Sequence, residues 1–136
     1  MIVMNPDGLR MSLLASAAAP GLVRTLVEQR LLKWDLLHRA DDALLVTGEL
    51  VTNAVNAAPG RELWVRFTRE ATGLLLEVWD PSGRVPQARP VELDLDDGEF
   101  DGIGGWGLHI VQVLSLECGY ALGPDGGKTV WALLEA

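Results

Sequence analysis

The sequence contains very little cysteine. Cys118 is the single cysteine among 136 residues, so the chain can form neither a disulfide framework nor a cysteine-based metal cluster within itself. This usage is typical of a reducing compartment, and we take the cytoplasm as the default location.

The chain also lacks an excess of positive charge and a long apolar run. Its formal net charge is -8, which argues against a nucleic-acid backbone as the main partner, although a few backbone amides can still offset a small polyphosphate. The apolar run at residues 13–20 is short, and Asp7 and Arg10 interrupt the apolar residues before it. We therefore expect neither a signal peptide nor a membrane span. The length fits a single domain over residues 1–136.

Residues 41–59 have the pattern of a helix with two different faces. Its apolar side consists of Leu44, Val51, Ala54, Val55 and Ala58. Glu49 and Asn53 lie one turn apart on the opposite side. Asp41 is the expected N-cap, and Pro59 ends the helix.

The polar side of this helix has two explanations. An amide oxygen suits Mg²⁺, and a carboxylate one turn away can orient or deprotonate a nucleophile near a phosphate. Glu49 and Asn53 therefore fit the floor of a nucleotide site. A solvated helix face explains the same spacing, and the helix alone does not decide.

An antiparallel hairpin follows, with strands at residues 61–69 and 74–80. In the second strand Asp80 is in phase with Leu74, Leu76 and Val78, which puts a carboxylate on the core face. A buried carboxylate needs a partner, because leaving it unpaired costs several kcal/mol. The alternative is a strand that ends at Trp79, with Asp80 already in a turn.

A glycine cluster at residues 102–107 opens the next helix. Glycines at a helix start leave backbone N–H groups free to approach a phosphate, and the helix dipole adds positive potential. No Gly-Lys-Ser/Thr follows, and a loop rather than a strand precedes the cluster, so neither a Walker loop nor a Rossmann turn is present. A flexible hinge before the helix is the alternative.

These elements together predict an α+β fold. The other expected elements are a loose lead-in over residues 1–9, a strand over 10–15, a helix over 17–33, a loop over 82–104, a helix from 105 that Gly119 ends, and strands at 120–123 and 129–134. This order predicts a two-layer α/β sandwich, with a mostly antiparallel mixed sheet covered on one face by helices.

Four motifs resemble the GHKL (Bergerat-fold) ATP-binding domain shared by gyrase, heat-shock chaperones, MutL and histidine kinases. They are Glu49-Leu-Val-Thr-Asn53-Ala-Val, Asp80-Pro-Ser-Gly83, Gly105-Trp-Gly107-Leu108 with its helix, and Gly127-Lys-Thr129-Val-Trp. The chain is most similar to the short stand-alone branch, the anti-sigma-factor serine/threonine kinases of actinobacterial type. The resemblance runs from about residue 10 to the end of the sequence.

The resemblance implies roles for the first two motifs. Asn53 would ligate the Mg²⁺ that bridges the phosphates, and Glu49 would be the general base toward an incoming hydroxyl. Asp80 would accept a hydrogen bond from the adenine amino group, which makes the ligand the missing partner of its carboxylate. Gly83 would let the chain pass close to the base.

It also implies roles for the last two motifs. Gly105, Gly107 and the backbone amide of Leu108 would meet the phosphates, with residues 82–104 as the ATP lid. Thr129 would support Asp80 and the adenine, directly or through water.

The function implied by the resemblance is that of an ATP-binding regulator. It would use ATP and Mg²⁺ to phosphorylate an anti-sigma antagonist protein, sequester a sigma factor, or both, with a homodimer as a further family expectation. We expect no direct nucleic-acid or membrane partner.

Two departures from the family pattern favour an alternative, an ATP-sensing or ATP-independent protein-binding switch without kinase turnover. Much of the family has a basic residue three positions after the motif asparagine, where this chain has Asn56 followed by Ala57. The lid is acidic, with Glu92, Asp94, Asp96, Asp97, Glu99 and Asp101. A detached histidine-kinase catalytic domain is a third alternative, which we expect less than the other two because no helix with a phosphoacceptor histidine precedes the fold.

Overall fold

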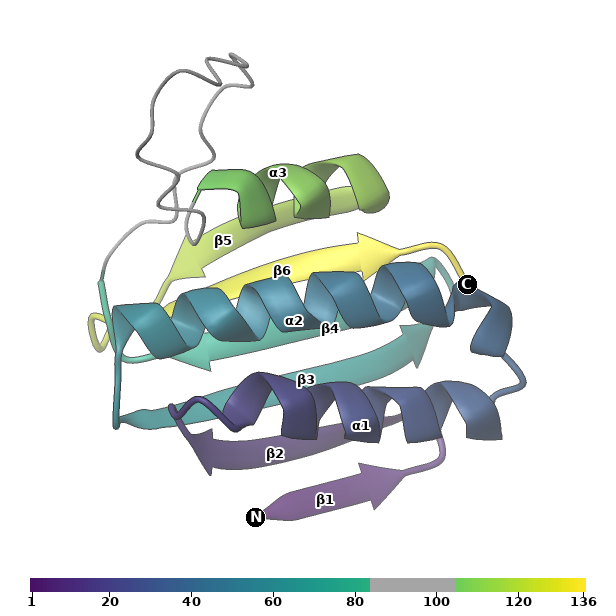
Figure 1. Cartoon of the computed structure of the whole chain (residues 1–136), viewed down its shortest axis with the longest axis horizontal. Helices are drawn as coiled ribbons and strands as arrows, with labels where there is room; N and C mark the ends of the chain where they lie inside the picture. The colour runs from purple at the N-terminus through teal and green to yellow at the C-terminus, as the bar shows by residue number, and fades with distance from the viewer. Residues whose placement is uncertain (84–104) are drawn as a thin grey trace.

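The computed structural model describes residues 1–83 and 105–136. In this part of the chain the elements form two layers, with the helices on one face of a single sheet (Figure 1). The predicted α+β sandwich is confirmed.

The sheet has the strand order β1-β2-β3-β4-β6-β5. Its strands are β1 (Ile2–Asn5), β2 (Gly8–Leu14), β3 (Glu62–Glu70), β4 (Gly73–Asp80), β5 (Glu117–Leu122) and β6 (Lys128–Leu134). Every pair of neighbouring strands is antiparallel, so the described sheet is antiparallel throughout rather than mixed.

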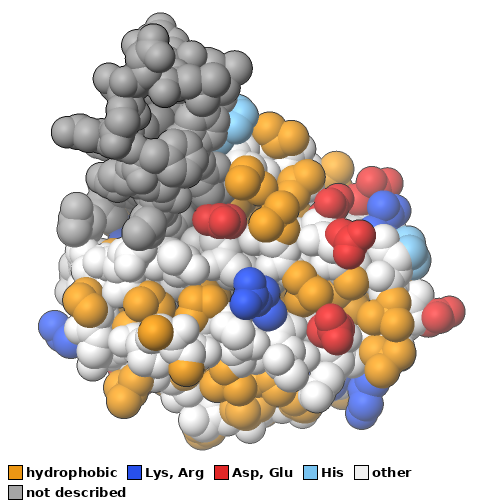
Figure 2. Space-filling model, viewed as in Figure 1, with side chains coloured by type: hydrophobic (Ala, Val, Ile, Leu, Met, Phe, Trp, Pro, Cys, Tyr) orange, Lys and Arg blue, Asp and Glu red, His pale blue; other side chains and the backbone are white. Residues whose placement is uncertain are grey.

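The helical layer is organised around its central helix. The helices are α1 (Ala19–Lys33), the short 3₁₀ helix η1 (Leu37–Arg39), α2 (Ala40–Ala57) and α3 (Gly105–Leu114). Helix α2 contacts both α1 and α3 and lies across the middle of the sheet (Figure 1). Apolar and charged side chains are mixed over the solvent side of this layer (Figure 2).

Helix α2 confirms the helix predicted over residues 41–59, although it starts differently. Arg39 occupies the N-cap position and makes no side-chain capping bond. Asp41 is therefore not the N-cap, and it lies with Asp42 in the first turn, where carboxylates interact favourably with the helix dipole. The 3₁₀ helix η1 ends at the residue directly before α2, so the chain enters α2 in a helical conformation without a side-chain cap.

The core lies between the helices and the sheet. Its largest fully buried side chains include Leu9, Leu31, Leu50, Leu63, Phe67, Leu74 and Leu76, and burial of each such side chain contributes about 1.5–3 kcal/mol. Trp34 closes one end of the core, with its ring centroid 5.4 Å from that of Phe67. The Trp34 Nε1–H donates a 2.9 Å hydrogen bond to the Pro6 carbonyl, which ties the first hairpin to the helical layer.

The N-terminal expectation is wrong. Residues 1–9 are not a loose lead-in, because β1 pairs with β2 from Ile2 opposite Met11 to Asn5 opposite Gly8. All four residues of β1 are exposed, so an edge strand of this kind shows none of the apolar–polar alternation that reveals a strand.

The expected end of the last helix is also wrong. Helix α3 ends at Leu114, and Gly119 lies inside β5 rather than after a helix. A Cβ atom on Gly119 would lie 3.1 Å from the Trp131 ring on the neighbouring strand, so this glycine makes room for a tryptophan. No helix in residues 1–83 or 105–136 is long and apolar enough to cross a membrane.

Candidate functional site

Most of the predicted site residues come from elements that meet at one end of the molecule. Figure 1 shows the C-terminal ends of α2 and β4 beside the starts of β6 and α3. Glu49 and Asn53 lie in the C-terminal half of α2, Asp80 is the last residue of β4, and Gly105 is the first residue of α3.

Glu49 and Asn53 are not on a fully solvated face. Both side chains are half-buried, whereas Asn56 on the same helix is exposed. The Asn53 Nδ2 atom is buried and has no hydrogen-bond partner among the described residues. Because buried amide groups are nearly always paired, this orphaned donor favours a ligand site over a solvated surface.

Asp80 is buried, with 1% of its surface exposed, and it faces the helices with Leu74, Leu76 and Val78. The core-face placement predicted for it is confirmed. The chain itself supplies a partner for this carboxylate in Lys128, which is 3% exposed, and the contact between Asp80 and the adenine amino group stays a prediction. The Lys128 Nζ atom lies 2.8 Å from Asp80 Oδ2 and 3.0 Å from Oδ1.

The two oxygens of the Asp80 carboxylate have different surroundings. Oδ1 accepts hydrogen bonds from the Ser82 backbone N–H at 2.8 Å and from Lys128 Nζ at 3.0 Å. Oδ2 is buried and in ionic contact with Nζ, but among the described residues it accepts no hydrogen bond of regular geometry. The carboxylate therefore keeps acceptor capacity for one further donor, such as an amino group.

Lys128 is the buried charged residue of the candidate site that the motif reading missed. In β6 it is in phase with Val130, Ala132 and Leu134, all of which are buried. The register sets Lys128 opposite Asp80 and Thr129 opposite Trp79. Because neighbouring side chains in a strand point to opposite faces, the structure does not bring the Thr129 side chain to Asp80. The predicted role of Thr129 at the base stays a prediction.

Two glycines let the chain pass closely beside the end of β4. A Cβ atom on Gly127 would lie 2.8 Å from Trp79 Nε1 and 2.9 Å from the Asp80 carbonyl oxygen. A Cβ atom on Gly83 would lie 3.2 Å from the Gly126 carbonyl oxygen. Gly83 is thus close to the chain itself, and its approach to a base stays a prediction.

The phosphate-binding part of the site is described only in part. Gly105, Gly107 and Leu108 lie in the first turn of α3, where free N–H groups and the helix dipole favour an anion. Their contacts with phosphates stay predictions. Residues 84–104, which make up most of the predicted lid, lie outside the described part of the chain.

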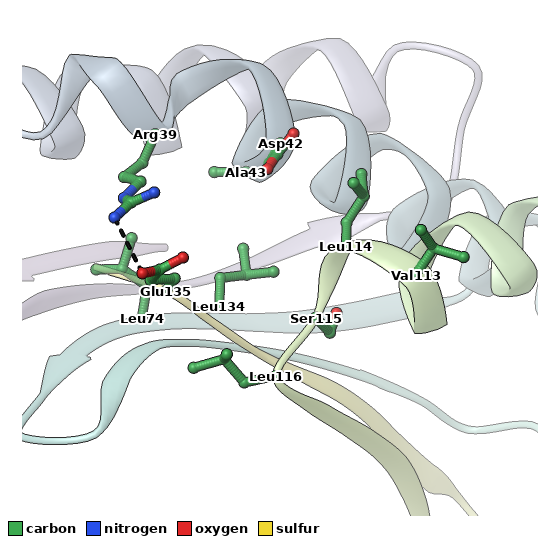
Figure 3. Close-up of a pocket in the computed structure, with 10 residues that line it drawn as sticks. All are labelled: Arg39, Asp42, Ala43, Leu74, Val113, Leu114, Ser115, Leu116, Leu134 and Glu135. Atoms are coloured by element: carbon green, nitrogen blue, oxygen red, sulfur yellow. Dashed lines mark ion pairs between the residues drawn. The ribbon is translucent and has the colours of Figure 1, made fainter.

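A separate cavity of about 220 Å³ lies near the other end of α2. It is lined by Arg39 and Asp42, among others, and contains the Arg39–Glu135 ion pair of 3.4 Å (Figure 3). No predicted site residue lines it, so it does not belong to the candidate site.

The described residues fit ATP with Mg²⁺. Asn53 offers an amide oxygen for the metal next to an orphaned amide nitrogen, and Asp80 offers an unused acceptor for an amino group.

A comparison with known protein families gives a match over most of the chain. A family model described as a histidine kinase-like ATPase domain matches residues 13–133. No curated protein gives a significant match. The matched segment spans nearly the whole chain and includes α2, the Asp80–Lys128 pair and the start of α3. The chain therefore belongs to the family of histidine kinase-like ATPase domains, which is an ATP-binding family of the GHKL type.

Proposed function

We propose that this domain binds ATP with Mg²⁺ and transfers the γ-phosphoryl group to a serine or threonine hydroxyl of a partner protein, as an anti-sigma-type kinase in the cytoplasm does. The observation that carries the proposal is the pairing of Glu49 with Asn53, one turn apart and half-buried at the end of α2 where Asp80 also lies. The orphaned Nδ2 atom of Asn53 supports a bound ligand there.

Each residue has a defined task in this proposal. ATP supplies the phosphoryl group, and Mg²⁺ offsets its negative charge. Asn53 Oδ1 holds the metal, and the Asp80 carboxylate holds the adenine amino group through its unused acceptor capacity. Glu49 would accept the proton of the attacking hydroxyl as the new oxygen–phosphorus bond forms, while the bond from the γ-phosphorus to the bridging oxygen breaks and ADP leaves.

The partner in this proposal is a small anti-sigma antagonist protein, with a sigma factor as a second partner that the domain sequesters. The support is the resemblance of the four motifs, together with the retained carboxylate at Glu49. A homodimer remains a family expectation of the same kind.

A second function is an ATP-sensing switch without turnover. It is favoured by Asn56, which is exposed and uncharged where much of the family carries a basic residue. The buried cation beside Asp80, Lys128, is already paired with that carboxylate and so does not replace the missing charge near the phosphates.

Incubation with γ-labelled ATP, Mg²⁺ and a candidate antagonist protein separates the two functions. The kinase proposal predicts label on the antagonist that Glu49→Ala abolishes. Nucleotide binding without any label transfer would favour the switch, and label transfer that survives Glu49→Ala would remove Glu49 from the role of base.

A further inference from the structure

Lys128 is an unusual residue for the interior of this fold. It is one of two lysines in the sequence, and only 3% of its surface is exposed. Burial of an ammonium group is costly, and it is tolerated only with close partners. Its position therefore calls for an explanation beyond packing.

The partners of the ammonium group account for two of its three N–H donors. Nζ donates to Asp80 Oδ1 at 3.0 Å and to the Ser82 carbonyl at 3.4 Å. The contact with Oδ2 at 2.8 Å is ionic and has no hydrogen-bond geometry. One N–H donor of Lys128 and one oxygen of Asp80 are therefore left without a regular hydrogen bond among the described residues.

These two unused groups lie next to each other. The pair thus presents one acceptor and one donor at adjacent positions, fixed by opposite register on β4 and β6. A fixed acceptor–donor pair recognises a ligand edge that carries the complementary donor and acceptor, and it rejects the reversed order because buried polar groups are then unpaired.

We propose that Lys128 is a base-specificity residue: it donates a hydrogen bond to the ring nitrogen adjacent to the amino group that Asp80 holds. The inference rests on the proposed ATP site and adds to it a second hydrogen bond that recognises the base. Adenine carries an amino group beside an unprotonated ring nitrogen and so matches the pair. A 6-oxopurine carries a carbonyl beside a ring N–H. Its carbonyl oxygen would face the Asp80 carboxylate, which is also an acceptor, and its ring N–H would face the Lys128 ammonium group, which is also a donor.

The test is calorimetric titration of the full chain, with Mg²⁺, against three nucleotides. They are ATP, inosine triphosphate, and 1-deaza-ATP, in which a C–H replaces the ring nitrogen. The wild-type chain should bind 1-deaza-ATP about tenfold or more weakly than ATP, as the loss of a hydrogen bond to a charged donor requires, and should bind inosine triphosphate more weakly still.

Lys128→Met should remove the preference for ATP over 1-deaza-ATP, so that the ratio of the two affinities falls to about one. Lys33→Met is the matched control, because Lys33 is the other lysine and is exposed on α1, and it should keep the wild-type ratio. If Lys128→Met does not fold, the charge-neutral double variant Asp80→Asn with Lys128→Met serves in its place, since the amide that replaces the carboxylate retains an acceptor.

Equal wild-type affinities for ATP and 1-deaza-ATP would overturn the inference and leave the ATP site standing. An unchanged ratio in Lys128→Met, or in the double variant that replaces it, would do the same. Failure of the wild-type chain to bind any of the three nucleotides would instead overturn the proposed function, and the inference with it.

Discussion

Asp80 and Lys128 occupy opposite positions in the antiparallel register of β4 and β6, and their side chains form an ion pair of 2.8 Å on the helix-covered face of the sheet. Each is the charged end of an otherwise apolar series of core-facing residues. The fold thus places a balanced pair of charges where ligand binding is proposed.

Removal of one member of the pair should destabilise the protein strongly. Lys128→Met leaves the Asp80 carboxylate buried without a counter-charge, which typically costs about 3–5 kcal/mol. Urea unfolding followed by circular dichroism measures the loss, with the exposed Lys33→Met expected within about 0.5 kcal/mol of wild type. A Lys128→Met chain as stable as wild type would show that the pair contributes little to the fold.

Two glycine-to-alanine changes should act in opposite directions. Gly127→Ala places a methyl group 2.8 Å from Trp79 Nε1 and 2.9 Å from the Asp80 carbonyl oxygen, and overpacking of this kind costs about 1–3 kcal/mol. Gly21→Ala meets nothing within 4 Å in helix α1 and should stabilise by about 0.5–1 kcal/mol. Thermal unfolding of both variants checks the two expectations. A Gly127→Ala chain as stable as wild type would contradict the packing described at Gly127, and destabilisation by Gly21→Ala would contradict the open space described at Gly21.

The strands with one buried face were predictable from the sequence, and the exposed edge strand was not. The period-two alternation placed Asp80 in phase with Leu76 and Val78, and the structure confirms that placement. In β1, by contrast, Ile2 and Val3 are exposed just as Asn5 is, so burial imposes no pattern on the sequence there.

The missed contact of Lys128 has a similar physical origin. A motif reading places Lys128 and Thr129 together, but only the register of β6 decides which of them faces the core. The alternation of Val130, Ala132 and Leu134 carried that information. The end of α3 was harder to predict, because a glycine after an apolar helical pattern usually marks the end of a helix. Gly119 instead makes room for a tryptophan on the neighbouring strand.

The single thiol should react slowly in the folded protein. Desolvation by burial raises the pKa of Cys118, which packs against the edge of the core, so the thiolate fraction at a given pH is lower than in the unfolded chain. The rate of alkylation by iodoacetamide at about pH 8 should rise when urea unfolds the protein. As the pH is raised, the rate in urea should level off first, and the rate in the folded protein should continue to rise to higher pH. Equal pH profiles in both states would refute the effect of burial.

Asn53 tests the central claim, which is that the end of α2 holds ATP through Mg²⁺. Calorimetric titration of the wild-type chain with ATP should show binding that depends on Mg²⁺. Asn53→Ala should weaken binding about tenfold or more through loss of a metal ligand, while Asn56→Ala, exposed nearly one turn further along the helix, should bind as the wild type does. Absence of wild-type binding at roughly millimolar ATP, or equal binding by Asn53→Ala, would contradict the account.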